Sequence, residues 1–420
     1  MKILITGLNF SPELTGIGKY TGEMAHWLAA AGAEVRVVTA PPYYPAWRVS
    51  AGFSGAHYRR ERAGKVSVLR CPLYVPSQPT GRQRILHLVS FGLSSAPATL
   101  WHALTWRPDL VFVVEPPLAC APVAWLAARL SGAACWLHVQ DFELDAAFEL
   151  GMLKSGLSRR ILNSVERWLL RRFDRVSTIS GKMLERLAAK GVAPQRRHLF
   201  PNWTDFERVH PLPRGTALRA ELGIADDTTV LLYSGTFGAK QGLELLVEAV
   251  RRIGDRARVE LLLCGDGPVR TALEMAAGDL ANVRFLPLQP LELLNDLMST
   301  ADIHLLPQRA GAADLVMPSK LPTMLASGRA VIASAAPESE LGRLVARVGR
   351  IVPPGDAGAL AEAIVELVAD PALREQIGLA GRELARGLWE VNAVLAAAFG
   401  HESVAPLGLN SPLRRVAEAV

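Results

Sequence analysis

Short apolar runs rich in β-branched residues alternate with longer helical patterns, and this alternation occurs twice along the chain. In the first 200 residues the candidate strands are 2–6, 34–39, 66–70, 110–114, 135–139, 175–179 and 197–200. In the rest of the chain they are 229–233, 258–264, 283–286, 303–306 and 330–333. Helical patterns lie between them, among them 20–31, 122–130, 243–253 and 319–326. Such alternation is typical of βαβ units, so we predict an α/β protein with two Rossmann-like, doubly wound parallel-sheet domains.

The 420 residues are enough for two or three domains, each with its own hydrophobic core. We predict an N-terminal domain over 1–205, a linker over 206–215, a C-terminal domain over 216–385 and a helical segment over 386–420. The linker is a polar stretch interrupted by proline and glycine, and the last segment could pack back on the N-terminal domain. Ligands of doubly wound sheets bind at the carboxyl ends of the strands, so we expect the two domains to face one another across a cleft.

Charge is distributed unevenly between the two halves of the chain. Residues 1–200 carry 25 basic and 13 acidic side chains, a net charge of +12, whereas 201–420 carry 21 basic and 27 acidic, a net charge of −6. Domains of opposite charge are expected to have different partners. A disordered chain is excluded, because half of the residues are hydrophobic and only 20% are charged.

The cysteines and the N-terminus both favour a cytoplasmic protein. Cys71, Cys120, Cys135 and Cys264 show no Cys-x-x-Cys or Cys/His spacing, so we expect buried free thiols, with neither zinc nor disulfides. The first apolar stretch is only about three residues long, which is too short for the core of a signal peptide.

Residues 85–106 contain no Asp, Glu, Lys or Arg. This length is close to what a membrane-spanning helix needs, but serine, histidine and proline lower the hydrophobicity. Three interpretations stay open: a helix of the core, a helix partly embedded in the membrane surface, and a spanning helix.

Residues 157–176 have the pattern of an amphipathic helix. The arginines expected near one stripe are Arg160, Arg167, Arg171 and Arg175. The apolar residues expected near the opposite stripe are Ile161, Val165, Trp168, Leu169 and Phe173. The basic stripe could simply be solvated or could contact anionic lipid, whereas no motif for nucleic-acid binding is present.

Glycine-rich turns follow several of the candidate strands. Glycine lets the backbone approach a ligand closely, and the N–H groups at a helix start can bind an anion. Gly16 and Gly18 occupy such a loop in the first domain, where an ordinary long loop is the alternative. The second domain has three such turns, and together they suit a nucleotide diphosphate. The residues expected to contact it are Gly235, Lys240, Asp266, Gly267, Met317, Pro318, Ser319 and Lys320.

In combination these features resemble glycosyltransferase family 4 of the GT-B fold, and more closely its WcaI-type members of colanic acid and related exopolysaccharide synthesis. The segments that carry the resemblance are 11–45, 136–145, 177–180, 201–205, 234–244, 264–268, 318–321, 325–334 and 352–356. The resemblance implies that the second domain binds the sugar nucleotide and the first binds the acceptor. It also implies that Gly16 and Gly18 approach the donor diphosphate from the opposite wall of the cleft.

The resemblance assigns further residues and also exposes departures from the family. His138 matches the histidine near the transferred sugar, and Asp141 is a carboxylate beside it, so both are candidate catalytic residues. Thr236 and Gln241 stand where the family usually has arginine and lysine, and they are candidate donor contacts. The family's two glutamates fall on Leu315 and on Thr323, a further candidate donor contact, with Asp314 the nearest carboxylate.

The implied reaction moves a sugar from a nucleotide-diphosphate sugar to a polyprenyl-diphosphate-linked exopolysaccharide intermediate, with retention and without metal or other cofactor. The resemblance to WcaI-type enzymes suggests GDP-fucose as donor. The enzyme would lie peripherally on the inner face of the cell membrane, through the four arginines given above. Two alternatives stay open: a sugar-nucleotide 2-epimerase of the same shape, and a non-catalytic subunit, which the loss of both glutamates would fit.

Overall fold

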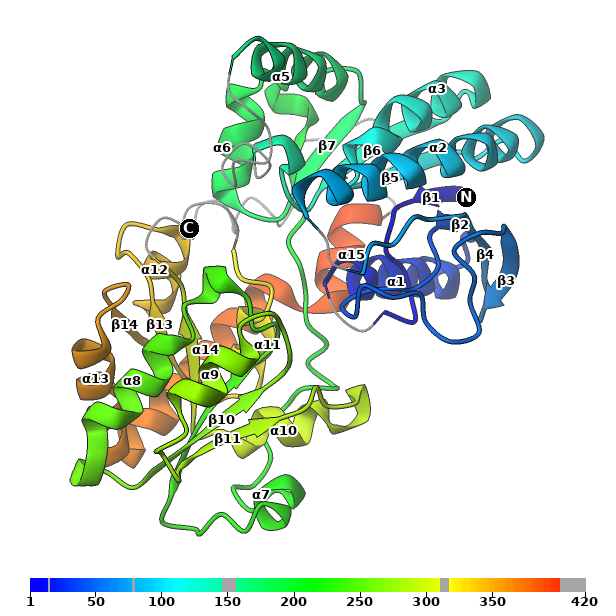
Figure 1. Ribbon diagram of the computed structural model, residues 1–420. Helices are drawn as coiled ribbons and strands as arrows, with labels where there is room; N and C mark the ends of the chain where they lie inside the picture. Colours follow the sequence, from blue (N-terminus) through cyan, green and yellow to red (C-terminus); the bar gives the residue numbers. More distant parts are fainter. Residues whose placement is uncertain (14–15, 78–79, 146–155, 310–316, 401–420) are drawn as a thin grey trace. The chain divides into compact units, whose positions relative to one another are not determined.

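The computed structural model describes residues 1–13, 16–77, 80–145, 156–309 and 317–400 (Figure 1). The chain divides into two compact units, Met1–Pro201 and the residues from Asn202 onward. Residues 206–215, predicted as a linker, belong to the second unit, because Phe206 and Val209 are buried in its core. None of the helices in the described segments has the length and hydrophobicity needed to cross a membrane.

The first unit is built on an eight-stranded sheet in the order β3-β4-β2-β1-β5-β6-β7-β8. Its strands are β1 (Lys2–Thr6), β2 (Glu34–Thr39), β3 (Arg59–Ala63), β4 (Val66–Arg70), β5 (Leu110–Glu115), β6 (Ala134–Val139), β7 (Arg175–Thr178) and β8 (Arg197–Leu199). All neighbours are parallel except β3 and β4. Strands β1 and β5 lie at the centre of the sheet. Their residues are mostly apolar and buried, because helices cover a parallel sheet on both faces.

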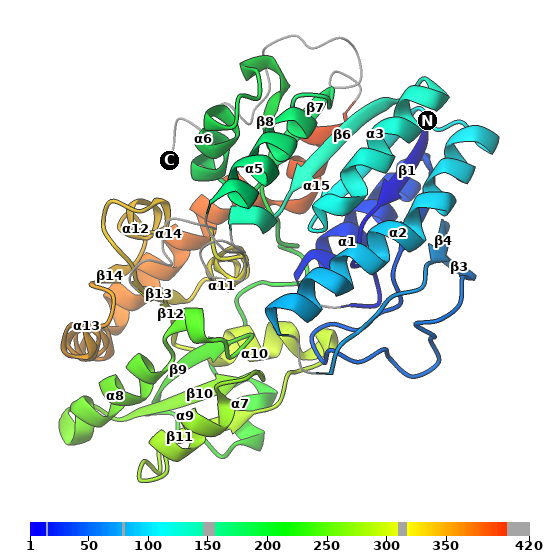
Figure 2. The ribbon, with the colours of Figure 1, turned by 45° about the horizontal axis from the view of Figure 1, so that its top comes forward.

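Helices cover both faces of this sheet. They are α1 (Gly16–Ala30), α2 (Gly81–Thr105), α3 (Ala121–Ser131), α5 (Leu157–Leu170), α6 (Gly181–Ala189) and the short 3-10 helices η1 (Leu118–Cys120) and η2 (Pro194–Arg196). The chain runs from β1 to β2 in one direction across the sheet and from β5 to β8 in the other. Right-handed crossovers therefore place α1 on one face and α2, α3 and α5 on the other, where Figure 2 shows them side by side.

The second unit has a six-stranded, wholly parallel sheet in the order β11-β10-β9-β12-β13-β14. Its strands are β9 (Thr229–Ser234), β10 (Val259–Cys264), β11 (Val283–Leu286), β12 (Ile303–Pro307), β13 (Ala330–Ser334) and β14 (Arg350–Val352). Alternate residues of β9 enter two separate cores. Leu231 and Tyr233 lie in one, and Val230 and Leu232 lie in the other. Both faces of the sheet are thus buried, and the predicted pair of doubly wound sheets is confirmed.

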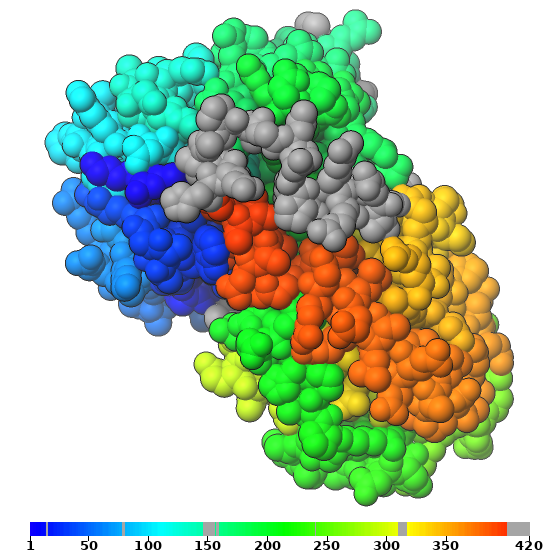
Figure 3. All heavy atoms as spheres, turned by 180° about the vertical axis from the view of Figure 1, so that it is seen from behind, coloured from blue at the N-terminus to red at the C-terminus, as the bar shows by residue number. Residues whose placement is uncertain are grey.

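Helices cover both faces of the second sheet as well. They are α7 (Ala217–Glu221), α8 (Glu244–Ile253), α9 (Arg270–Ala276), α10 (Leu294–Thr300), α11 (Leu321–Ala326), α12 (Glu340–Val345), α13 (Ala357–Ala369), α14 (Pro371–Trp389), α15 (Val391–Phe399), η3 (Ala239–Gln241), η4 (Gly254–Arg256) and η5 (Leu291–Leu293). Helices α13 and α14 form part of the unit's outer surface (Figure 3, orange).

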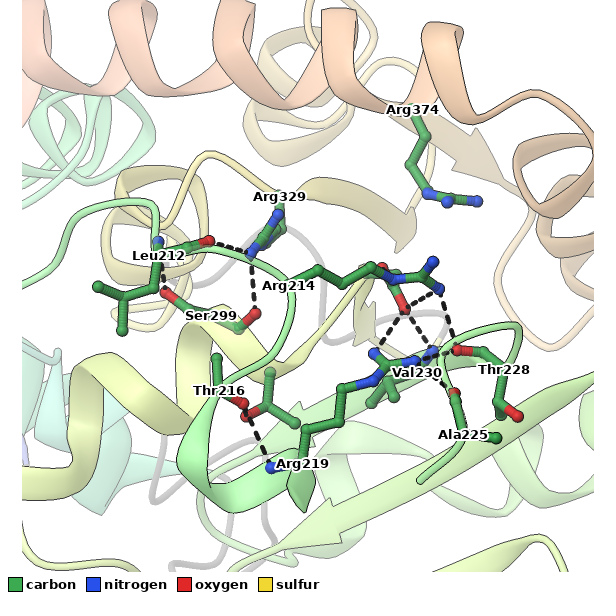
Figure 4. Close-up of polar contacts among 12 residues, drawn as sticks. Leu212, Arg214, Thr216, Arg219, Ala225, Thr228, Val230, Ser299, Arg329 and Arg374 are labelled. Carbon is green, nitrogen blue, oxygen red and sulfur yellow. Dashed lines mark hydrogen bonds and ion pairs between the residues drawn. The ribbon is translucent and has the colours of Figure 1, made fainter. Parts of the chain in front are cut away.

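A buried carboxylate, Asp302, joins several segments near the amino ends of β9 and β12. It is 6% exposed and accepts hydrogen bonds from Arg219 Nη1 at 3.3 Å and from the Val230 backbone N–H at 2.8 Å. Its other oxygen lies 3.0 Å from Arg214 Nε. Figure 4 shows Arg214 and Arg219 pointing toward the same place beside Val230. This network attaches the segment that enters the second unit to the start of its sheet.

All four cysteines are buried free thiols, as predicted. Burial raises the pKa of Cys71 and of Cys120 to about 12. These thiols are therefore protonated at neutral pH.

Candidate functional site

The carboxyl edge of the second sheet contains a topological switch point between β9 and β12. The chain moves from β9 outward through β10 to β11, and then returns to place β12 on the other side of β9. In doubly wound sheets the connections on the two sides of such a point diverge to opposite faces, and ligands bind there. Two of the predicted glycine turns and the Met317–Lys320 turn follow strands at this edge.

The two glycine turns pack directly against one another. The Gly235 N–H donates to the Cys264 carbonyl at 2.8 Å, and the Phe237 N–H donates to the Asp266 carbonyl at 2.8 Å. A Cβ atom on Gly265, which has φ +145°, would lie 1.9 Å from the Gly235 carbonyl oxygen. A side chain cannot be accommodated there, so glycine is needed to keep the two loops together.

Lys320 packs against the first of these loops. Its ammonium lies 4.0 Å from the centre of the Tyr233 ring and donates a hydrogen bond to the Tyr233 hydroxyl, which in turn donates to the Thr236 carbonyl at 2.8 Å. A Cβ atom on Gly235 would lie 2.3 Å from Lys320 Cε. The structure therefore brings together the predicted residues Gly235, Thr236 and Lys320, and it adds Tyr233.

The Lys320 ammonium is short of a negative partner. Burial lowers its pKa to about 7, and within the described residues no carboxylate forms an ion pair with it. A desolvated cation is stabilised by an anion brought next to it. A phosphate could supply this anion, and the contact between Lys320 and the donor diphosphate stays a prediction.

The other candidates of this edge contribute in different ways. The exposed Asp266 accepts a hydrogen bond from the Gly267 N–H at 2.7 Å, so its carboxylate shapes the loop. Gln241 ends η3, and its buried Oε1 has no hydrogen-bond partner in the part of the chain that the structure describes. The Thr323 hydroxyl on α11 lies 3.2 Å from that of Thr204.

Three neighbouring candidates precede α11 in a turn. Met317 and Pro318 are half-buried, and Ser319 is exposed. The side chain of Lys240, together with Asp314 and Leu315, lies outside the described residues.

His138 ends up inside the first unit, at the end of β6. It is 4% exposed and packs on Phe200 with ring centres 4.9 Å apart. Its Nδ1 lies 2.9 Å from Ser177 Oγ, and its Nε2 lies 2.9 Å from Gln140 Nε2. Burial lowers the pKa of His138 to about 3, so the ring is neutral. A sugar hydroxyl could reach Nε2 only if the Gln140 amide moved away. Asp141 follows Gln140 and is half-buried.

A carboxylate that the sequence did not single out organises the first loop. Glu13 is 6% exposed and accepts hydrogen bonds from the Tyr43 and Tyr44 backbone N–H groups at 2.9 and 3.0 Å and from Asn9 Nδ2 at 2.9 Å. A Cβ atom on Gly18 would lie 2.7 Å from Glu13 Cβ. Position 18 therefore needs glycine, because a side chain there would collide with Glu13. Burial raises the pKa of Glu13 despite these bonds.

Gly16, the other predicted glycine of this loop, is exposed at the first residue of α1 and has φ +60°. That conformation favours glycine. Its predicted approach to a donor diphosphate stays a prediction.

The predicted basic helix forms, but its sides differ from the expected stripes. Arg160, Arg167 and Arg171 are exposed, as expected of a solvent-facing stripe. Arg175 belongs instead to β7 and lies over the Trp136 ring at 5.3 Å.

The apolar stripe of this helix is also divided. Leu169 and Phe173 are buried, whereas Ile161, Val165 and Trp168 are about half exposed. The buried side of α5 instead includes Glu166, Leu169 and Leu170, so only part of the apolar stripe is covered. Next to Trp168 is a groove of about 610 Å³ whose lining includes Arg129, Arg167, Trp168, Arg171, Arg172 and Arg196.

The structure bears on the three interpretations of 85–106 given above. The segment is part of α2, which is buried on one side and exposed on the other, and which is not a spanning helix. Among the described residues, no group of three or more His, Cys, Asp and Glu side chains is placed to hold a metal ion.

Comparison with known proteins identifies the chain's relatives. A Glycosyl transferase 4-like domain matches residues 15–203, and Glycosyl transferases group 1 matches 228–370. The chain is 46% identical to the colanic acid biosynthesis glycosyl transferase WcaI of Escherichia coli over 351 residues, which are 82% of this chain and 86% of that protein.

Solved structures share the fold. Sucrose-phosphate synthase from Thermosynechococcus elongatus superposes with a TM-score of 0.73 at 22% identity, covering 94% of this chain and 96% of that one. HepE of Anabaena, solved in complex with UDP-glucose, gives a TM-score of 0.67 at 17% identity over 94% and 97% of the two chains. The chain therefore belongs to glycosyltransferase family 4 and has the GT-B fold, as its sequence predicts.

Proposed function

We propose that this glycosyltransferase moves a sugar from a nucleotide-diphosphate sugar to a lipid-linked intermediate of exopolysaccharide synthesis. The observation that carries the proposal is Lys320, a half-buried lysine whose ammonium has no carboxylate partner among the described residues and which packs against Gly235 at the switch point of the second sheet. A diphosphate would supply the negative charge that this site lacks. Similarity to WcaI supports exopolysaccharide synthesis as the setting of the reaction.

The donor is proposed to bind along the edge formed by Gly235, Thr236, Gly267 and Lys320. Its diphosphate would lie at the lysine, and the nucleoside would extend over the glycine turns. HepE, a structural relative, binds UDP-glucose, which supports a nucleotide sugar as ligand. GDP-fucose is our first choice of donor because of the similarity to WcaI, and a screen against several sugar nucleotides would decide the base and the sugar.

Chemistry at this site is proposed to depend on stabilising the leaving group. When the anomeric bond breaks, negative charge grows on the nucleoside diphosphate. Lys320 and backbone N–H groups of the adjacent turns are fixed in place, and fixed donors stabilise a developing charge more than solvent does. We therefore propose transfer without metal or other cofactor and, as in the GT-B relatives that the sequence resembles, with retention of configuration.

His138 and Asp141 stay candidates for contact with the transferred sugar. We expect His138→Ala to lower the turnover number at least tenfold and the affinity for nucleoside diphosphate less than threefold, because His138 belongs to the first unit and the proposed diphosphate site at Lys320 belongs to the second. His87→Ala is the matched control, since His87 is also a buried histidine of the first unit. Steady-state kinetics and calorimetry give both quantities. Equal losses of turnover in the two variants would assign His138 a structural role only.

The acceptor is proposed to be anchored by a polyprenyl diphosphate, which places the enzyme on the inner face of the cell membrane. The first unit carries the positive charge of the chain, and Arg160, Arg167 and Arg171 are exposed on it. Basic residues near an anionic leaflet contribute roughly 1 kcal/mol each to binding.

Release of nucleoside diphosphate, measured with and without lipid-linked acceptor, tests the proposed function. We expect release that depends on the acceptor, together with a sugar-bearing lipid product. Isomerisation of the donor without acceptor would identify the 2-epimerase instead. Donor binding without any turnover would identify a non-catalytic subunit, and either of these results would refute the proposal.

A further inference from the structure

Helix α2 exposes several large apolar side chains on its outer side. Leu93, Trp101 and Leu104 are 72%, 59% and 56% exposed. The inner side packs closely, since a Cβ atom on Gly92 would lie 2.8 Å from Ala119 Cβ. The exposed apolar residues follow one another every three or four positions and therefore form one stripe along the helix. They are Leu86, Val89, Leu93, Pro97, Trp101 and Leu104.

The neighbouring helices continue this apolar surface. Leu126 and Leu130 of α3 are 42% and 53% exposed, and Ile161, Val165 and Trp168 are the half-exposed residues of α5. The rings of Trp125 on α3 and Trp168 lie 6.1 Å apart, so α3 and α5 are in contact. Helices α2, α3 and α5 lie beside one another on the same side of the first sheet (Figure 2). We call the outer surface of these three helices the three-helix face.

The three helices of this face carry mostly basic charge, although Arg129 pairs with the exposed Asp174 just beyond α5. The arginines of the three helices are Arg82, Arg84, Arg129, Arg159, Arg160 and Arg167. The single acidic residue in the three helices is Glu166, which is 1% exposed and forms an ion pair with Lys190. A solvent-facing apolar stripe with an excess of basic residues around it matches the surface of an anionic lipid leaflet.

The same charges argue against a second copy of the chain as the occupant. A twofold dimer would place identical patches against each other, so the arginines of one copy would face those of the other. Like charges brought together at an interface are unfavourable. A lipid surface supplies the opposite charge and also covers the apolar stripe.

We propose that the three-helix face docks on an anionic membrane by inserting the apolar stripe of α2, with Trp101, into the boundary between headgroups and acyl chains. This inference rests on the proposed function, because an enzyme that uses a lipid-linked acceptor has to reach the membrane that holds it. It goes beyond the arginines of α5, because the apolar stripe makes the attachment persist when salt screens the charges.

Vesicle binding of a stripe variant tests the inference. The variant is Leu93→Glu with Trp101→Glu, and its matched control is Met275→Glu with Leu379→Glu, at two exposed apolar positions of the second unit. The probe is vesicles of phosphatidylglycerol and phosphatidylethanolamine, at 0.15 M and 1 M NaCl. We expect wild type and control to bind at both salt concentrations, more weakly at 1 M, and the stripe variant to bind at least tenfold more weakly at both. Equal binding of wild type and stripe variant would overturn the proposal.

Depth of insertion provides a second test that needs no change of charge. Lipids brominated on their acyl chains should quench wild-type tryptophan fluorescence more than that of Trp101→Phe. Equal quenching of the two proteins would contradict insertion of Trp101. A stripe variant that converts a dimer to a monomer and keeps its vesicle binding would assign the stripe to self-association and overturn the proposal.

Transfer to a detergent-solubilised acceptor separates this inference from the proposed function. The stripe variant should keep that transfer and its affinity for nucleoside diphosphate while it loses vesicle binding. Wild-type protein that binds vesicles through the stripe but transfers no sugar would refute the proposed function alone.

Discussion

Replacement of Lys320 by methionine is expected to weaken binding of UDP or GDP about 100-fold, which corresponds to about 2.7 kcal/mol. Methionine keeps the length of an unbranched side chain over the Tyr233 ring but removes the ammonium. In a buried site the lost ion pair with a diphosphate is worth more than at an exposed position. Isothermal titration calorimetry with the nucleoside diphosphates measures the difference directly.

The pH dependence of the same titration gives an independent check. Burial lowers the pKa of Lys320 to about 7 in the free protein, and a bound diphosphate would raise it. Above pH 7, binding should therefore take up a proton, and affinity should fall as the pH rises. The phenol of Tyr233 does not interfere, because burial raises its pKa. Titrations in buffers of different ionisation enthalpy count the protons, and Lys320→Met should show no such uptake from this residue.

Lys182→Met is the control for the substitution of Lys320. Lys182→Met removes a lysine of the first unit that pairs with Glu185 at the surface. It should leave the affinity within twofold of wild type. If Lys320→Met also binds within twofold of wild type, the lysine does not contact the diphosphate.

Asp302→Ala is expected to lower the free energy of unfolding of the second unit by about 3 to 5 kcal/mol. The substitution leaves Arg219, which is 2% exposed, without its carboxylate, and it also removes the acceptor of the Val230 N–H. Breaking a buried ion pair in this way leaves an uncompensated charge in the protein interior. Urea denaturation, fitted to the transition of the second unit, provides the measurement.

Asp227→Ala is the matched control for this effect. Asp227 pairs with Arg258 in the same unit, but both side chains are 64% exposed. Ion pairs at the surface typically contribute about 0 to 1 kcal/mol. Similar losses in the two variants would mean that the Asp302 network does not hold the segment that enters the second unit.

Most of the fold could be predicted from the sequence, because buried parallel strands are short apolar runs with glycine turns. The strand β3 was missed, since its sequence Arg-Arg-Glu-Arg-Ala is polar and it lies at the edge of the sheet. Helix α1 begins at Gly16 and not at Tyr20, because glycine in the first turn hides the helical pattern. Helix α11 begins at Leu321, two residues later than predicted, since Ser319 and Lys320 form a turn.

The site could be predicted only in part. The glycine turns and Lys320 could be found in the sequence, because the glycines cluster directly after predicted strands and the lysine stands at the start of a predicted helix. Tyr233 and Glu13 were missed, since in sequence one resembles a core residue of a strand and the other an ordinary loop carboxylate. Their importance depends on contacts with residues far along the chain, Lys320 and Tyr43. Arg175 was placed on the basic helix because the helical pattern extends to it, whereas α5 ends at Leu170 and Arg175 begins β7.

Hydrogen–deuterium exchange with and without nucleoside diphosphate tests the central claim most directly, because it locates the donor site without any substitution. The claim is that the diphosphate binds at the carboxyl edge of the second sheet. Saturating UDP or GDP should slow exchange at least tenfold in peptides covering 234–242, 264–270 and 317–321. Slower exchange confined to the first unit, or unchanged exchange at all three segments under saturation, would contradict the account.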